Sequence, residues 1–186
     1  MTNEETDKEL YNQYLKGNKE AFEKLVIKHK NNIIYFISRY TKNTQIAEDI
    51  SQDVFVYLLV NKNQYDFQYS FKTYLYMIAK CRAINYLKRE KRIININDYE
   101  NMYIEDNNLE EEIFKEEDSQ NVRKVIKQLK PDYQAVIYLT SFEGLKYKEV
   151  AKIMNKNINQ IKVLVNRAKK KMKILLEEEG FSYENR

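Results

Sequence analysis

Hydrophobic residues recur along most of this chain with the period of an amphipathic helix. In the N-terminal half the pattern predicts helices over about residues 19–40, 44–61 and 70–92. In the C-terminal half it predicts a short helix over residues 147–154 and a long one from residue 158 to about residue 176. Three glycines and one proline in 186 residues leave little material for tight turns or a β-sandwich. We therefore predict an all-α fold.

The two C-terminal helices are separated by only three residues, 155–157. Asn155 tolerates the left-handed conformation that ends a helix, and Asn157 is a favourable N-cap for the helix that follows. A sharp turn between a short and a longer helix is typical of a helix-turn-helix motif.

The long C-terminal helix has two different faces. Its apolar face predicts core packing and holds Ile161, Leu164, Val165, Ala168 and Met172. The opposite face holds Asn159, Val163, Asn166 and Lys170. A solvated surface helix shows the same polarity, but asparagine also suits adenine, and valine suits the thymine methyl group. DNA binding is favoured by the flanking cations, which neutralise phosphates: Lys162, Arg167, Lys169, Lys170, Lys171 and Lys173.

Charge divides the chain into three blocks. Residues 1–92 carry 16 basic and 11 acidic side chains, residues 93–121 carry 1 and 10, and residues 122–186 carry 15 and 7. This distribution predicts two small basic domains, 1–92 and 122–186, joined by a flexible acidic linker over 93–121. A further hypothesis is that the linker covers the basic domain faces when DNA is absent.

The second predicted helix of the N-terminal domain has a clustered acidic face. Its apolar side holds Ala47, Ile50, Val54, Tyr57 and Leu58, and its polar side holds Glu48, Asp49, Gln52 and Asp53. Acidic side chains repel DNA. The face is therefore either plainly solvated or a binding site for a basic protein surface.

An aromatic residue occupies every second position between this helix and the next: Tyr65, Phe67, Tyr69 and Phe71. The segment can be a half-buried extended strand, a loop anchored in the core, or a platform on which unstacked bases stack. The helix that follows is strongly basic, which favours single-stranded nucleic acid.

The sequence offers no recognisable catalytic or metal-binding set. Its glycines, at positions 17, 144 and 180, are too scattered for a phosphate-binding loop. One histidine and one cysteine do not make a zinc cluster or a catalytic triad. We expect Cys81 to be a half-buried thiol, His29 to be exposed, and no cofactor to be bound. The sequence also shows no signal peptide or membrane-spanning stretch, which predicts a cytoplasmic protein.

Several segments resemble the extracytoplasmic-function (ECF) sigma factors. AFEKL (21–25), AEDISQDVF (47–55) and FKTYLYMIAK (71–80) are similar to region 2 of that family. LKP (129–131), EGLKYKEVA (143–151), IK (161–162) and RA (167–168) are similar to region 4. Both blocks occur in the family's order, with a linker where the family has one.

The resemblance implies a non-catalytic promoter-specificity subunit of RNA polymerase. Its partners would be core polymerase (the β′ clamp helices and the β flap), promoter DNA and an anti-sigma factor. The matching core-binding positions are Asp49, Gln52 and Asp53. The positions that match −10 element contacts are Tyr65, Phe67, Lys72, Tyr74, Lys80, Arg82 and Lys88. Those that match −35 element contacts are Asn159, Gln160, Lys162, Val163, Asn166, Arg167 and Lys170.

Three departures from the family pattern concern the −10 contacts. Tyr74 stands where the family commonly has tryptophan, Cys81 where it commonly has asparagine, and Asn85 where it commonly has aspartate. The −10 base preference of relatives therefore does not transfer to this chain. Two other functions stay open: a stand-alone helix-turn-helix regulator that dimerises on palindromic half-sites, and a nucleic-acid enzyme in which Asp49 and Asp53 hold Mg²⁺.

Overall fold

The computed structural model describes residues 5–93 and 119–179. Every regular element in these two ranges is helical, which confirms the all-α prediction. The chain divides into two compact units, Met1–Leu109 and Glu110–Arg186, and each is described by itself. Nearly all of the predicted acidic linker, 93–121, lies outside the described residues, so its conformation stays a prediction.

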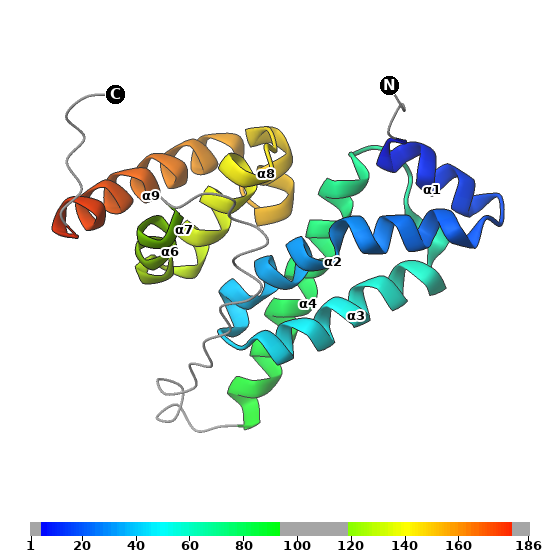
Figure 1. Cartoon of the computed structure of the whole chain (residues 1–186), viewed down its shortest axis with the longest axis horizontal. Coiled ribbons are helices and arrows are strands. Elements are labelled where there is room, and N and C mark those ends of the chain that lie inside the picture. Colours follow the sequence, from blue (N-terminus) through cyan, green and yellow to red (C-terminus); the bar gives the residue numbers. More distant parts are fainter. Residues whose placement is uncertain (1–4, 94–118, 180–186) are drawn as a thin grey trace. The chain divides into compact units, whose positions relative to one another are not determined.

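The first unit is a bundle built around its second helix. Its elements are α1 (Asp7–Leu15), α2 (Lys19–Thr41), α3 (Thr44–Val60), a 3₁₀ turn η1 (Lys62–Gln64) and α4 (Phe71–Ile93). α2 packs against α1, α3 and α4 (Figure 1). The ends of α2, α3 and α4 lie within one residue of the predicted boundaries.

Asparagine caps fix where α2 and α3 begin. The Asn18 side chain accepts a hydrogen bond from the backbone N–H of Ala21 at 3.3 Å, and Asn43 accepts one from Ile46 at 3.1 Å. Between the helices, Lys42 takes the left-handed conformation (φ 53°) that ends α2. The resulting two-residue turn makes α2 and α3 neighbours.

Helix α1 was not predicted, although its start signal is visible in the sequence. Thr6 and Glu9 form a reciprocal capping box, with the Thr6 N–H donating to Glu9 Oε2 at 2.8 Å and the Glu9 N–H donating to Thr6 Oγ1 at 3.3 Å. Only four of its nine residues are apolar, and two of these are tyrosines, so its hydrophobic period is weak. The Thr-x-x-Glu spacing before Leu10 and Tyr11 is the signal that would have found it.

Two sequence expectations about single residues are wrong. His29 was expected to be exposed, but only 2% of it is accessible, because α1 covers it and brings Asp7 Oδ2 within 2.8 Å of its Nε2 atom. Cys81 was expected to be half-buried, but it is exposed. Ala79 and Ala83 occupy the buried side of α4, and Cys81, about 200° around the helix from each, therefore faces away from the core.

The second unit is arranged around its last helix. Its elements are α6 (Ser119–Gln128), α7 (Pro131–Ile137), a π-helical turn η2 (Tyr138–Phe142), α8 (Tyr147–Met154) and α9 (Ile158–Glu178). α9 packs against α6, α7 and α8. Val125 of α6 and Leu129, which follows this helix, are buried against Leu175 and Leu176 of α9. The Gln134 amide donates to the Leu129 carbonyl at 2.7 Å, which satisfies a backbone acceptor between α6 and α7.

Among the helices within 5–93 and 119–179, none combines the length and the hydrophobicity that crossing a membrane requires.

Candidate nucleic-acid interfaces

The turn between α8 and α9 has the geometry predicted for its two asparagines. Asn155 is left-handed, with φ 52°, and the Lys156 N–H donates back to the Ala151 carbonyl at 2.9 Å. The Asn157 side chain accepts from the Gln160 N–H at 2.8 Å, while Gln160 Oε1 accepts from the Asn157 N–H at 2.9 Å. Gln160, expected only as a DNA contact, is therefore also a cap residue.

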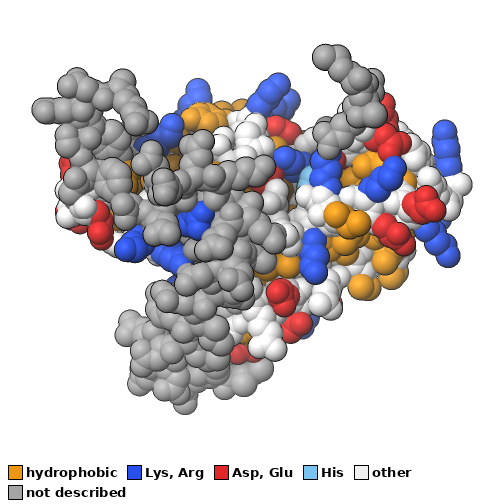
Figure 2. Space-filling model, in the orientation of Figure 1, with side chains coloured by type: hydrophobic (Ala, Val, Ile, Leu, Met, Phe, Trp, Pro, Cys, Tyr) orange, Lys and Arg blue, Asp and Glu red, His pale blue; other side chains and the backbone are white. Residues whose placement is uncertain are grey.

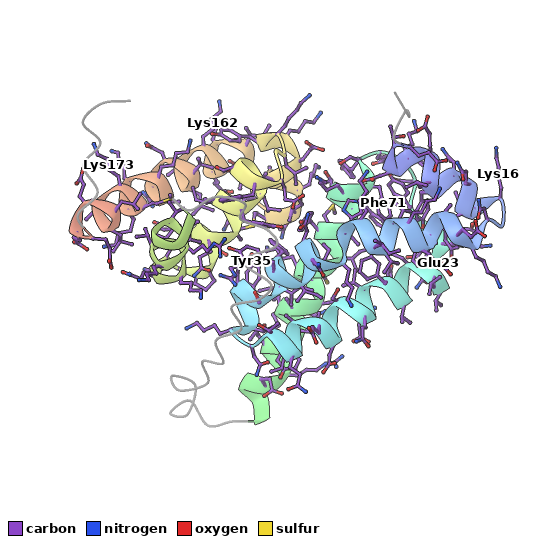
Figure 3. All side chains as sticks on the ribbon, in the orientation of Figure 1. Lys16, Glu23, Tyr35, Phe71, Lys162 and Lys173 are labelled. Carbon is purple, nitrogen blue, oxygen red and sulfur yellow. The ribbon has the colours of Figure 1, made fainter. Side chains whose placement is uncertain are left out.

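The two faces of α9 separate as the sequence pattern predicts. Ile161, Val165 and Ala168 are buried, and Leu164 and Met172 are half-buried. The residues expected at the −35 element are all exposed: Asn159, Gln160, Lys162, Val163, Asn166, Arg167 and Lys170. Lysine and arginine side chains stand along this unit in Figure 2, and Figure 3 shows Lys162 pointing away from α9. The exposed face has the composition of a DNA-binding surface.

A hollow of about 390 Å³ lies at the start of α9. None of the residues that line it is acidic: Lys156, Asn157, Asn159, Gln160, Val163, Leu164 and Arg167. Amide and cationic side chains around an open hollow suit base edges and phosphate oxygens.

The polar face of α3 is exposed, and it continues into an apolar strip. Glu48, Asp49, Gln52 and Asp53 are all exposed, whereas Ala47, Ile50, Val54 and Leu58 are buried. Toward the end of the same helix, Val56, Leu59 and Val60 are exposed by 53%, 47% and 76%. Figure 2 shows red and orange side chains gathered over α2 and α3 of this unit. The acidic part follows from the sequence pattern, whereas the apolar strip was not predicted.

The structure places Tyr65 in the core, which corrects its expected role as a ring open to a DNA base. Only 4% of Tyr65 is exposed, and its hydroxyl donates to the Tyr69 carbonyl at 2.7 Å. Its ring meets the edge of Tyr11 at 5.0 Å and stacks on Tyr74 at 5.1 Å between centroids. Burial raises the pKa of Tyr65 and of Tyr74 to about 12. Tyr65 is therefore a buried residue against which Phe67 and Tyr74 pack.

Phe67 has an unusual backbone conformation for a non-glycine residue. Its φ is 59°, in the left-handed region, where a bulky residue is strained by about 1–3 kcal/mol. The half-buried Phe67 ring lies 4.4 Å from the Tyr65 centroid and 6.2 Å from that of Tyr11. These rings pack on Phe67 at the rim of a hollow.

That hollow has a volume of about 620 Å³, within the range of ligand sites in proteins. It is lined by Thr6, Asp7, Lys8, Lys28, Tyr65, Phe67, Gln68, Tyr69, Ser70, Phe71 and Lys72. Figure 3 labels Phe71, which lies where α4 begins, beside α1 and α2. The hollow combines aromatic walls with three lysines, the pattern of a site for unstacked bases. Of these lining residues, Tyr65, Phe67 and Lys72 were predicted from the sequence, whereas those of α1 and α2 were not.

Asp7 is the carboxylate of this hollow, and it is already paired. Its Oδ1 lies 3.0 Å from Lys28 Nζ, and its Oδ2 lies 2.8 Å from His29 Nε2. Burial raises its pKa, but the hydrogen bond and charge of His29 and then those of Lys28 outweigh burial and lower the pKa to about 2. Asp7 is therefore ionised at neutral pH.

The cations expected at the −10 element do not all meet at one place. Lys72 lines the hollow of about 620 Å³, whereas Arg82, about 15 Å further along α4, lines another of about 130 Å³ with Asp53 and Arg89. The Arg82 guanidinium lies 5.2 Å from the centroid of the Tyr57 ring. Lys80 is half-buried and Lys88 is exposed.

Two family models match the chain, one in each unit. The model described as sigma-70 region 2 matches residues 25–93, and that described as sigma-70 region 4 matches residues 119–172. The RNA polymerase sigma-H factor of Pseudomonas aeruginosa is 28% identical over 180 residues, which cover 91% of this chain and 93% of that protein. The ECF RNA polymerase sigma-E factor of Escherichia coli K12 is 27% identical over 179 residues, with the same coverage.

Solved structures show the same fold. The sigma factor RpoE from Bartonella quintana, in complex with the anti-sigma factor NepR, has a TM-score of 0.66 at 20% identity and covers 84% of this chain and 96% of its own. CnrH, in complex with the cytosolic domain of CnrY, also has a TM-score of 0.66 at 20% identity and covers 95% and 100%. With regions 2 and 4 in this order and relatives along nearly its whole length, the chain belongs to the sigma-70 family of RNA polymerase sigma factors, in the ECF group.

Proposed function

We propose that this sigma factor directs promoter-specific initiation by dividing DNA recognition between its two units. The second unit binds the −35 element through α9, and the first binds core polymerase through α3 and the −10 element through the aromatic segment and α4. The observation that carries the proposal is the separation of faces on α9, where all seven expected contacts are exposed opposite a buried side. The chain itself supplies binding energy, while polymerase supplies the catalytic chemistry.

At the −35 element, α9 enters the major groove with its N-terminal part leading. Asn159 and Asn166 offer amides to adenine edges, and Val163, 49% exposed, offers an apolar contact to a thymine methyl group. Lys162, Arg167 and Lys170 contact phosphates and fix the register of the helix on the duplex.

At the −10 element, the hollow beside Phe67 receives a base that has left the stack. Phe67 provides an aromatic wall, and Lys8, Lys28 and Lys72 hold the strand that carries the base. Stacking on an aromatic side chain contributes about 1–3 kcal/mol per base. Because this energy is available only to the open strand, it shifts the promoter toward melting. Tyr65 and Tyr74 support the wall.

The exposed acidic face of α3 binds a basic surface of core polymerase, through Asp49, Gln52 and Asp53. Docking fixes the first unit on the enzyme, so that the second DNA contact becomes effectively intramolecular and avidity rises. This division of labour predicts weak promoter binding by the free chain. It also places the protein where the polymerase works, in the cytoplasm.

An anti-sigma factor is a further partner, since a structural relative was solved with one. The apolar strip of Val56, Leu59 and Val60, next to the acidic residues of α3, is a surface that such a partner can cover. Covering it would block the polymerase-binding face at the same time.

Run-off transcription with purified core RNA polymerase tests the proposal. Added to a library of promoter fragments, the full chain should direct initiation from a subset that shares −35 and −10 sequences. Asp49→Lys should abolish that initiation, while Glu23→Lys, a charge reversal at an exposed position of α2, should not. No initiation, together with tight binding of the free chain to palindromic sites, would instead identify a stand-alone regulator.

A further inference from the structure

Helix α1 lies before the residues that match the region 2 family model, yet it contacts the aromatic segment directly. Tyr11, in the middle of α1, is fully buried. Its ring centroid lies 5.0 Å from that of Tyr65, 6.2 Å from that of Phe67 and 5.2 Å from that of Phe71. Its hydroxyl donates to the Lys62 carbonyl of η1 at 2.9 Å. One side chain of α1 thus touches three rings of the segment and the turn before it.

α1 is itself anchored on both sides of Tyr11. Near its start, Asp7 bridges Lys28 and His29 of α2 at 3.0 and 2.8 Å. Near its end, the Tyr14 hydroxyl donates to the Leu59 carbonyl at 3.3 Å, and the Tyr14 ring packs 4.7 Å from that of Phe22. Tyr11 therefore meets the aromatic segment from a helix that is held at two points.

The contact between Tyr11 and Phe67 matters because Phe67 has an unusual backbone conformation. A left-handed φ of 59° at a phenylalanine persists only where the surroundings impose it. Of the two rings that pack on Phe67, Tyr65 belongs to the same segment, whereas Tyr11 reaches it from a separate helix. Removal of the Tyr11 ring would leave Phe67 free to relax toward ordinary backbone angles and would open one side of the hollow.

We propose that Tyr11 is a positioning residue for promoter opening. It holds the segment from Tyr65 to Phe71, and Phe67 above all, in the shape that forms the base-receiving hollow. The consequence for DNA rests on the proposed function of this segment at the −10 element. The consequence for the shape of the segment does not rest on it.

Fluorescence of the free chain tests whether Tyr11 maintains the shape of the segment from Tyr65 to Phe71. The protein has no tryptophan, so Phe67→Trp supplies a single indole probe. Adding Tyr11→Leu to this variant should shift the emission to the red and raise quenching by acrylamide. Tyr40→Leu is the matched control, because it removes a buried tyrosine of the same unit whose ring packs on Phe36 near the end of α2. It should change the emission far less. Hydrogen exchange of residues 65–71 in the variants without tryptophan gives a second measure, should Phe67→Trp fold poorly.

Transcription by the full chain with core polymerase tests whether Tyr11 contributes to promoter opening. Tyr11→Leu should slow the formation of open complexes by about tenfold, a loss that a barrier increase of about 1.4 kcal/mol would produce. Its affinity for core polymerase should stay within about twofold of wild type, because the α3 face is untouched. Tyr11→Phe keeps the ring and should restore most of the opening rate.

The outcomes distinguish the positioning role of Tyr11 from the proposed function of the protein. Unchanged emission and exchange in Tyr11→Leu overturn the positioning role, and so does equal loosening by Tyr40→Leu. Normal promoter opening by a chain whose segment has loosened overturns it as well. If wild-type protein directs no initiation at all, the proposed function fails, and the free-chain measurements still decide whether Tyr11 holds the segment.

Discussion

Asn157 and Gln160 exchange two hydrogen bonds, at 2.8 and 2.9 Å, across the first turn of α9. Each side chain satisfies a backbone N–H of the other residue, and together they fix the residue at which the helix begins. The buried residues Ile161, Val165 and Ala168 then determine which side of α9 is exposed.

Loss of the Asn157 cap should destabilise the second unit. Asn157→Ala removes the acceptor of the Gln160 N–H, and the free energy of unfolding should fall by about 1 kcal/mol, the typical cost of an N-cap deletion. Urea denaturation monitored by circular dichroism measures the change. Asn159→Ala, two residues further on at an exposed position, should leave stability nearly unchanged. Equal losses in the two variants would remove the structural role of the cap.

Replacement of Asn166 and of Lys162 by alanine should have different effects on DNA binding. Asn166→Ala should relax base preference at one position of the −35 element, at a cost of about 1–3 kcal/mol on the preferred sequence. Lys162→Ala should weaken all sequences nearly equally and reduce the salt dependence by about one counterion. Binding of the holoenzyme to a set of single-base promoter variants, at several salt concentrations, separates the two effects. If Asn166→Ala changed no position selectively, the assignment of its amide to a base would be wrong.

Charge reversal on α3 should weaken the complex with core polymerase. Asp49 is exposed and lies on the outer side of its helix, so Asp49→Lys should leave the fold intact. We expect affinity for core polymerase to fall by at least about tenfold, equivalent to about 1.4 kcal/mol. Fluorescence anisotropy of labelled protein measures it. The control is Glu23→Lys on α2, which should bind as wild type does; a shared loss would point to net charge instead of a defined site.

The Asp7 carboxylate should make the first unit sensitive to acid. Its pKa is lowered to about 2 in the folded protein from an unfolded value near 3.8. A lowered folded pKa stabilises the fold above the unfolded pKa, and the contribution disappears as the pH falls from about 4 to 2. Since Asp7 is partly accessible, we expect the contribution at pH 7 to be on the order of 1–2 kcal/mol.

Asp7→Asn isolates that contribution. Urea denaturation at pH 7 should show the variant to be less stable than wild type, and the difference should vanish near pH 2. Glu20→Gln, at an exposed position of α2, should parallel wild type throughout. A difference between Asp7→Asn and wild type that stayed constant over this pH range would show that the carboxylate charge is not what stabilises α1.

Much of the secondary structure of this protein follows from the local pattern of apolar and polar residues. The period of apolar residues predicts α2, α3, α4, α8 and α9 with their boundaries close to those observed, because in each the apolar residues recur at helical spacing. The outward faces of α3 and α9 follow for the same reason. A helix that buries one side must expose the other, so the periodicity alone places Asp49 and Asn166 at the surface.

Contacts between segments that are far apart in the sequence are visible only in the tertiary structure. His29 was expected to be exposed and Tyr65 to contact DNA. Both are buried, and α1, a helix of nine residues, packs over them. The hollow beside Phe67 draws its lining from α1, α2 and the aromatic segment, which are separated by tens of residues. Periodicity reports the environment along one element, whereas burial, ion pairs and cavities depend on which elements meet. In this chain the sequence determined α2, α3, α4, α8 and α9 and the outer faces of α3 and α9, whereas packing decided which aromatic rings are buried.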